Sequence, residues 1–199
     1  MCSSDLVVLI GNYAADVDAV AVEDVEGARA ATEHLIAHGR RAIAHISGPL
    51  NHQTAIDRLE GFRLALAQAG RSADGETAVV AGDFDEATGA IAARELFDRN
   101  PELDAIFAAN DEMAYGALVE IRSRGLRVPD DIAIIGYDDF GVSRITTPAM
   151  TTISVPAAEV GRRATRRLLD ILDKRTPFRR EVLPVALTVR ESCGCPPQG

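Results

Sequence analysis

The sequence has 199 residues, 47% hydrophobic and 26% charged, and its 30 acidic and 21 basic side chains give a formal net charge of -9. This balance is typical of a globular chain with one good core or two small lobes, and no apolar run approaches the ~20 residues that span a bilayer. A chain this acidic is not expected to bind nucleic acid by itself. The start lacks the features of a signal peptide, so we expect a cytoplasmic protein.

Apolar segments that can form strands alternate with segments of helical spacing along most of the chain. The expected strands are Leu6–Ile10, Ala42–Ser47, Thr77–Ala81, Ala105–Ala109 and Ile132–Tyr137. The expected helices run from Asp24 to Gly39, from Thr54 to Gly70, from Asp85 to Asp98 and from Asp111 to Gly125. Strands and helices that alternate over short connections form parallel sheets with right-handed crossovers. We therefore expect an α/β fold with a doubly wound, mostly parallel sheet.

The pattern changes after Tyr137, where Thr147-Pro148 interrupts it. A short strand at Thr152–Val155, a helix from Pro156 to Asp173 and an extended run at Val182–Val189 are expected there. The helix carries an apolar stripe of Val160, Ala164, Leu168 and Leu172. It also carries a basic stripe of Arg162, Arg163, Arg166 and Arg167. Because no aromatic residues interleave with them, these arginines favour a solvated helix face over a nucleic-acid footprint.

Polar side chains follow the expected strands where those strands end. Ligands of open α/β sheets bind beyond the carboxyl ends of the strands. Reading off those ends selects four candidate ligand-binding residues, Arg58, Phe84, Asn110 and Asp138. A guanidinium, an aromatic ring, an amide and a carboxylate together suit a small polyhydroxylated or cyclic ligand. Each has a simpler alternative: Arg58 as a surface ion pair, Phe84 as packing, Asn110 as a turn residue.

Asp138 and Asp139 follow a strongly apolar strand without a basic residue beside them. Burial of a carboxylate without a partner is costly, so a purely structural role does not readily explain Asp138. Asp139 is expected to be solvated or to cap the next turn. Asp24, Asp85 and Asp111 are candidate helix N-caps.

No catalytic motif of a common enzyme class is present, and we expect neither an enzyme nor a cofactor. His34 and His38, four residues apart on one expected helix, are either a metal-binding pair or part of a polar face, and the polar face is favoured. Cys193 and Cys195 are either a metal or redox pair or, with Cys2, incidental thiols, and incidental thiols are favoured. A small α/β enzyme that uses Asp138 or Asp139 as an acid–base group or metal ligand is an alternative.

Several motifs resemble the effector-binding half of the lactose-repressor (LacI/GalR) family. They are RLEGFRLALAQAG, IFAANDEMAYGAL, GLRVPDDIAIIGYDDF and TTISVPAAEVGRRA, supported by HLIAHGRRAIAHISGPL and VRESC. They occur in the family's order from about Val7 to Cys193. Members of that family carry a helix-turn-helix, a hinge and a two-lobed sensor like that of periplasmic sugar-binding proteins. They form dimers that bind operator DNA with an affinity that a small effector shifts.

The resemblance implies that this chain senses a sugar-like or nucleobase-like effector and would reach DNA only through a segment that it lacks. It assigns ligand contacts to the same four residues, Arg58, Phe84, Asn110 and Asp138. Gly11, followed by Asn12, stands where the family commonly has a polar contact. A solute-binding protein for sugar uptake shares this architecture and is the main alternative.

The resemblance begins late in the N-terminal lobe, so we expect a truncated chain with one wall of the effector cleft and weak or no effector binding by itself. One back-translation of Cys2–Leu6 matches a common sequencing adapter, which suggests a non-native start. The expected division is 1–6 non-native, 7–23 a remnant of the N-terminal lobe, 24–155 the C-terminal lobe, 156–181 a crossover and helix of the N-terminal lobe, 182–193 a return strand and 194–199 a disordered tail. We expect a homodimer in the full-length form, with the 156–173 helix partly exposed or docked on a second chain.

Overall fold

The computed structural model describes residues 7–11, 17–71, 78–173 and 179–195. Its elements are, in chain order, β1 (Val8–Ile10), β2 (Asp18–Val22), α1 (Asp24–Ala37), β3 (Ile43–Ser47), α2 (Gln53–Gln68), β4 (Val79–Ala81), α3 (Glu86–Arg99), β5 (Ala105–Ala108), α4 (Asp111–Ser123), β6 (Ala133–Asp138), α5 (Val142–Ile145), β7 (Thr151–Ser154), α6 (Ala157–Asp173), β8 (Arg180–Leu183) and β9 (Ala186–Thr188). Cys2, Asn12, Thr77 and the expected segment 1–6 lie outside the described residues, as do residues 196–199 of the expected tail.

The larger sheet has six strands in the order β4-β3-β5-β6-β7-β9. Its first five strands are parallel to their neighbours, and β9 alone pairs antiparallel, along β7. The chain steps from β3 to β4 on one side and then from β5 onward on the other, so the order reverses between β3 and β5. This confirms the predicted doubly wound, mostly parallel sheet, and such a reversal is where ligands of this architecture bind.

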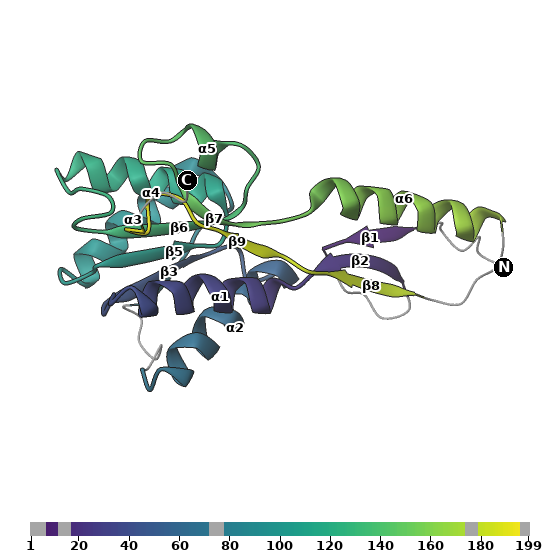
Figure 1. The fold of residues 1–199 in the computed structure, drawn as a ribbon, viewed down its shortest axis with the longest axis horizontal. Coiled ribbons are helices and arrows are strands. Elements are labelled where there is room, and N and C mark those ends of the chain that lie inside the picture. The colour runs from purple at the N-terminus through teal and green to yellow at the C-terminus, as the bar shows by residue number, and fades with distance from the viewer. Residues whose placement is uncertain (1–6, 12–16, 72–77, 174–178, 196–199) are drawn as a thin grey trace.

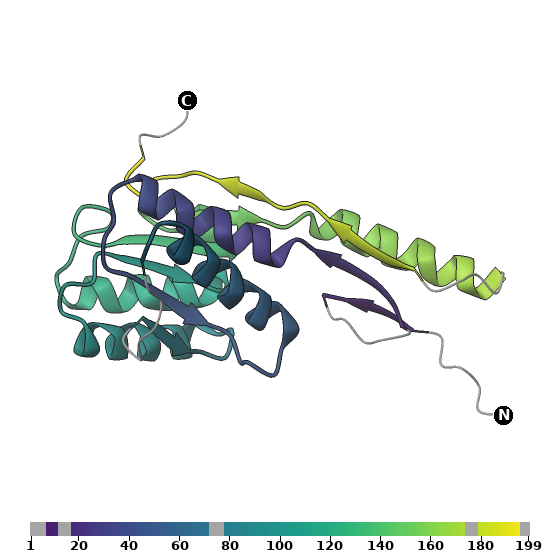
Figure 2. The same ribbon diagram turned by 90° about the horizontal axis from the view of Figure 1, so that it is seen from below.

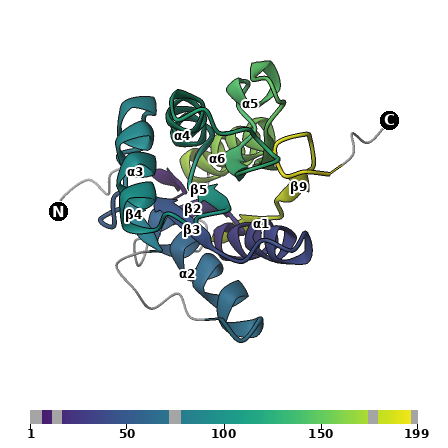
Figure 3. The same ribbon diagram turned by 90° about the vertical axis from the view of Figure 1, so that its left-hand side faces the viewer.

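Helices cover both faces of the larger sheet, with α1 and α2 on one face and α3 and α4 on the other (Figure 3). Successive residues of a strand point to opposite faces of the sheet, and β6 follows this rule. Ala133 and Ile135 pack toward α1 and α2, whereas Ile134 packs toward α3 and α4. All three are fully buried. The continuous apolar run of this strand is therefore explained by two cores, one on each face. We call this sheet and helices α1 to α5 the larger lobe.

The smaller sheet has the order β1-β2-β8, with all pairs parallel, and α6 packs on it against β1 and β2. Figures 1 and 2 show this smaller lobe set apart from the larger lobe along the long axis of the molecule. Val160 and Ala164 of α6 are buried against Val20 and Val22 of the sheet. Farther along the stripe Leu172 is 61% exposed. The apolar stripe is therefore partly exposed, as predicted.

Between the two lobes the described chain crosses three times, from β2 to α1, from β7 to α6 and from β8 to β9. The expected single run Val182–Val189 is wrong in one respect, because it is divided into two strands that belong to different sheets. Pro184 separates them and has no backbone N–H to continue a ladder. One backbone hydrogen bond ties two of the crossings together, since Glu23 N donates to Leu183 O, and another ties the β7–α6 crossing to the end of β6, since Val155 N donates to Asp138 O.

Two of the three predicted N-caps are wrong. Asp85 does cap α3, accepting from Thr88 N at 2.8 Å. The cap of α4 is Asn110, however, which accepts from Met113 N, and Asp111 is the first helical residue. Asp24 likewise begins α1 without capping it and turns toward Arg58. Among the described residues, every helix is too short or too polar to serve as a membrane span.

Candidate functional site

Arg58 is the centre of the polar cluster at the carboxyl edge of the larger sheet. It lies on the second turn of α2 and its side chain is 8% exposed. Its Nε donates to Asp24 Oδ1 at 2.7 Å, one terminal nitrogen donates to Ala109 O at 2.5 Å, and the other lies 3.4 Å from Asp138 Oδ1. The guanidinium carbon stands 3.7 Å from the centre of the Tyr137 ring. Four residues, from α1, the end of β5 and β6, thus hold one cation in a fixed orientation.

Asp138 ends β6 in a backbone conformation with φ of 107°, which turns its carboxylate toward Arg58. Burial raises the pKa of Asp138 to about 7 from an ordinary value of 3.8, and the attraction of Arg58 opposes that rise. Burial likewise opposes the charge on Arg58, but Asp138 and Asp24 together raise its pKa, so it stays charged. The predicted pairing of Arg58 with Asp138 at one edge of the sheet is confirmed.

Asn110 and Phe84 form the second half of the cluster. Asn110 Nδ2 donates to Phe84 O at 2.8 Å while its Oδ1 caps α4, so both ends of the amide are used. Phe84 follows β4, and its ring packs over Gly48 in the loop after β3. A Cβ added to Gly48 would stand 2.2 Å from the ring. Because Ala109 O accepts from Arg58, the two halves are joined through the Ala109–Asn110 peptide.

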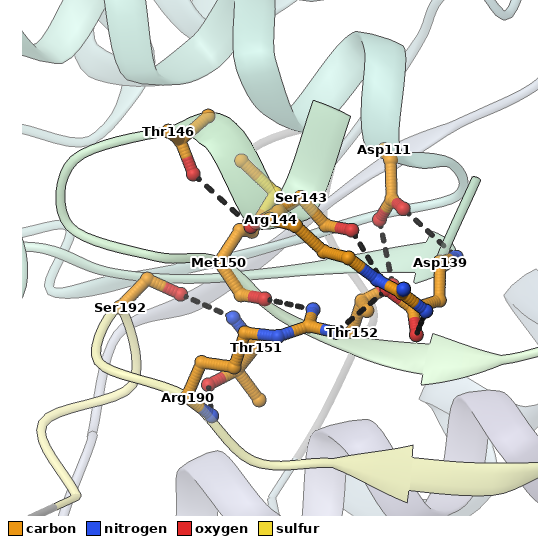
Figure 4. Close-up of polar contacts among 10 residues, drawn as sticks. All are labelled: Asp111, Asp139, Ser143, Arg144, Thr146, Met150, Thr151, Thr152, Arg190 and Ser192. Atoms are coloured by element: carbon orange, nitrogen blue, oxygen red, sulfur yellow. Dashed lines mark hydrogen bonds and ion pairs between the residues drawn. The ribbon is translucent and has the colours of Figure 1, made fainter. Parts of the chain in front are cut away.

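Asp139 is fully engaged, so the expectation that it is solvated or caps a turn is wrong. Its carboxylate accepts from Ser143 Oγ at 2.9 Å, from an Arg190 nitrogen at 2.7 Å and from Arg144 (Figure 4). Burial acts to raise its pKa, but the hydrogen bonds from Arg144, Arg190 and Ser143 hold it below the ordinary value. Asp139 therefore joins the end of β6 to α5 and to the segment after β9.

Asp111 supports the same turn from the start of α4 (Figure 4). Its carboxylate accepts from Thr152 Oγ1 at 2.6 Å and from the backbone N of Asp139 at 2.8 Å. Burial raises the pKa of Asp111 to about 6, against these two hydrogen bonds. The left-handed backbone of Asp138 and Asp139 is held by these contacts, so the aim of Asp138 depends on residues that do not face the cluster.

A cavity of about 270 Å³ lies at the crossing between the two lobes. Arg58 and Asp138 line it, whereas Asn110 and Phe84 do not. Its other walls come from both lobes and the crossings, namely Ile10, Gly11, Val20, Ala21, Val22, Asp24, Thr54, Phe140, Val155, Ala157, Val160 and Gly161. The predicted Gly11 position, which directly follows β1, is therefore at the cavity.

Sequence reasoning missed Asp24 as a member of the site. It is 2% exposed, it lines the cavity, and its Oδ2 has no hydrogen-bond partner among the described residues. Aspartate is a common N-cap, so the position of Asp24 at the start of a helix predicts a capping role and gives no sign of a ligand site. Beside an apolar wall, the buried guanidinium can donate to a ligand with several hydroxyl or ring-nitrogen groups, and the two carboxylates next to it can accept from that ligand.

Residues 32–193 match the family described as "Periplasmic binding protein-like domain". The chain is 44% identical over 174 residues, 87% of its length and 51% of the relative's, to the HTH-type transcriptional regulator CelR of Thermobifida fusca. It spans about half the length of the curated relatives that it matches.

Solved structures give the same result. A transcriptional regulator CelR–cellobiose complex is 42% identical with a TM-score of 0.90, over 93% of this chain and 58% of that one. A regulatory protein of LacI family from Chloroflexus aggregans is 32% identical with a TM-score of 0.84, over 93% of this chain and 67% of that one. The resemblance stated from the motifs is confirmed. The chain belongs to the periplasmic binding protein-like domain family, in the form that makes up the effector-binding region of LacI-family transcriptional regulators.

Proposed function

We propose that this chain is the sensor of a LacI-type transcriptional regulator and that it binds a small sugar-like or nucleobase-like effector at the cavity between its lobes. The observation that supports this most directly is the buried Arg58 guanidinium, oriented by Asp24 and Asp138 at the cavity wall. In this proposal Arg58 donates to the effector and Asp138 accepts from it. Phe84 and Asn110, which do not line the cavity, are proposed to contact the part of the ligand that extends beyond it toward the ends of β3 and β5.

The position of the cavity supports a sensing role rather than simple storage. Asp138 O accepts from Val155 N, which lies on the crossing from β7 to α6, so an effector at Asp138 would act on one of the connections between the lobes. Closure of two lobes about such connections is a hinge motion. A ligand that binds the closed form better shifts the population toward it, and a dimer that carries DNA-binding segments can transmit that shift.

The proposed partners follow from the relatives. Several are named as HTH-type transcriptional regulators or repressors, so operator DNA is proposed as the partner of the whole protein, through a segment outside these 199 residues. We also propose a homodimer, a cytoplasmic location and no enzymatic activity. A sugar is favoured as the effector class because one similar structure is a complex with cellobiose and another contains bound ribose.

A chimera tests the proposal, with residues 7–199 replacing the matching half of Thermobifida fusca CelR. Calorimetric titration with cellobiose, ribose, glucose, adenine and guanine is expected to give saturable binding for one class. Asp138→Asn in the chimera should then weaken that binding about tenfold or more, which corresponds to loss of about one charge-assisted hydrogen bond. Asp98→Asn is the matched control, because Asp98 is an exposed carboxylate of α3 that pairs only at the surface with Arg124.

Two results would contradict the proposal at different levels. A chimera that folds, by circular dichroism and cooperative unfolding, but binds none of these compounds argues against the sensing function. A chimera that binds one of them equally well with and without Asp138→Asn keeps the function but removes the assigned site.

A further inference from the structure

Two features that the sequence presents separately meet at the far end of α1. His34 and His38 lie one turn apart at the end of that helix, with ring centres 4.2 Å apart. Cys195, which follows β9, lies against both: its Sγ is 3.2 Å from His34 Nε2 and 2.9 Å from His38 Nε2. These three donor atoms all lie within 4.8 Å of one another. Figure 2 shows the C-terminal segment reaching this end of α1.

Hydrogen bonding prepares His38 to be a ligand. Its Nδ1 lies 2.8 Å from His34 O, and because a carbonyl oxygen only accepts, Nδ1 must carry the proton. In the neutral ring the lone pair is then on Nε2, the atom that faces Cys195. Metal-ligating histidines show this arrangement in general, with the other ring nitrogen donating to a carbonyl or carboxylate that fixes the ring.

The surroundings favour a cation. The last turn of α1 presents carbonyl groups with the negative end of the helix dipole, and the chain carries a formal net charge of -9. Cys195 is half-buried and His38 is exposed, so an ion can reach the three atoms from solvent. Behind them Cys193 is buried and its Sγ accepts from Thr151 Oγ1 at 3.2 Å, which anchors the segment that carries Cys195.

We propose that His34, His38 and Cys195 form a binding site for a borderline-soft divalent cation of the zinc class. Two imidazole nitrogens and one thiolate are ligands that Zn²⁺ prefers, and in tetrahedral coordination water would take the fourth position. Zinc–ligand distances of about 2.3 Å to sulfur and 2.0–2.1 Å to nitrogen place tetrahedral S and N atoms about 3.5 Å apart. The two sulfur–nitrogen distances, 3.2 and 2.9 Å, therefore need to lengthen by less than about 1 Å, and the two imidazole nitrogens already lie within 4.8 Å of each other. Binding replaces the thiol proton of Cys195, which is released to solvent.

Such an ion would link α1 to the C-terminal segment across 157 to 161 residues of sequence. An ion that binds the folded chain and not the unfolded chain raises the unfolding temperature, and the rise grows with the logarithm of the free ion concentration above the dissociation constant. The site shares no residue with the lining of the effector cavity, so its test is independent of the proposed function.

The experiment is a Co²⁺ titration of the 199-residue chain, purified with chelator and kept reduced by a phosphine. We expect one equivalent of Co²⁺ to give the visible d–d bands of tetrahedral coordination and a near-ultraviolet thiolate charge-transfer band, both removed by Zn²⁺. His38→Gln and Cys195→Ser should each weaken binding at least about tenfold. His52→Ala, which removes a histidine outside the cluster, should leave it unchanged.

Unfolding scans in chelator show whether each variant folds, and Zn²⁺ should then raise the midpoint of the parent chain but not of His38→Gln. A folded, reduced parent chain without the cobalt bands overturns the proposal. So does a cobalt spectrum that survives both His38→Gln and Cys195→Ser, because the ligands would then lie elsewhere.

Discussion

The two lobes differ in how completely their sheets are covered. The larger sheet has helices on both faces, and its central residues Ile106, Phe107, Ile134 and Ile135 are fully buried. The smaller sheet packs against α6, which buries Val160 and Ala164 but leaves Leu169 54% and Leu172 61% exposed. Stability should therefore come from the larger lobe, while the smaller lobe supplies one side of the cavity.

The largest expected effect is removal of a central aromatic side chain. Phe107 lies in the middle of the larger sheet between β3 and β6 and stacks on His45 with ring centres 4.8 Å apart. Phe107→Ala should lower the free energy of unfolding by about 3–5 kcal/mol because it leaves a cavity in a packed core. Urea denaturation followed by circular dichroism measures the change.

Leu172→Ala is the matched control in the smaller lobe, and it should change stability by less than about 0.5 kcal/mol because the side chain is mostly exposed. Equal losses from the two substitutions would show that α6 is covered by something in solution, such as a second copy of the chain.

The next effect concerns close packing between α3 and α4. A Cβ added to Gly116 would stand 2.0 Å from Glu86 O and 2.8 Å from Ala90 N, and both of those atoms are backbone. Gly116→Ala must therefore push the helices apart, and we expect a loss of about 1–3 kcal/mol. A urea midpoint equal to that of the parent chain would show that the two helices separate without cost.

The pH dependence of stability probes the buried carboxylates. The pKa values of Asp138 and Asp111, about 7 and about 6, lie above the ordinary 3.8, so between pH 4 and 7 the folded state holds protons that the unfolded chain has released. Their contribution to stability therefore falls as pH rises through this window and levels off above it. Between pH 5 and pH 8, the free energy of unfolding of Asp138→Asn should therefore rise relative to that of the parent chain by about 1–3 kcal/mol.

The stability of the variant must be compared with that of the parent chain at each pH, because the titration of His45 changes stability in the opposite direction. Burial lowers the pKa of His45 to about 3, so its contribution to stability is lost as pH falls below the unfolded value of 6.5. That effect is common to both proteins and cancels. A parent-minus-variant difference that is constant from pH 5 to pH 8 would mean that Asp138 titrates as an ordinary carboxyl.

The larger lobe could be predicted from sequence because its signals are local. Buried parallel strands are continuous apolar runs, and such strands finish at one edge, which is why Arg58 and Asp138 could be expected to meet. The observed separation of 3.4 Å between their charged groups agrees with that expectation. The observed helix ends differ from the expected ones by only a few residues. Several residue types can cap a helix, so the sequence does not single out the capping residue.

The parts that could not be predicted depend on contacts between distant residues. Asp139 was expected to be solvated because its partner Arg190 lies 51 residues away. The division of the run at Val182–Val189 depends on which sheet offers a free edge, which an extended pattern does not encode. From the sequence the histidine pair and the C-terminal cysteine each have a simpler explanation, because only the fold brings them within hydrogen-bonding distance of each other.

The smallest expected effect is the counterpart of Gly116 in the smaller lobe. Gly161 lies inside α6, and a Cβ added there would have no heavy atom within 4 Å among the described residues. Alanine in a helix interior is more favourable than glycine by about 0.8–1.0 kcal/mol, so Gly161→Ala should stabilise the chain slightly. The same substitution would then have opposite signs in the two lobes, although both glycines are helical. Because Gly161 lines the cavity, a loss of stability would instead show that this wall packs more closely in solution than the open space around its Cβ implies.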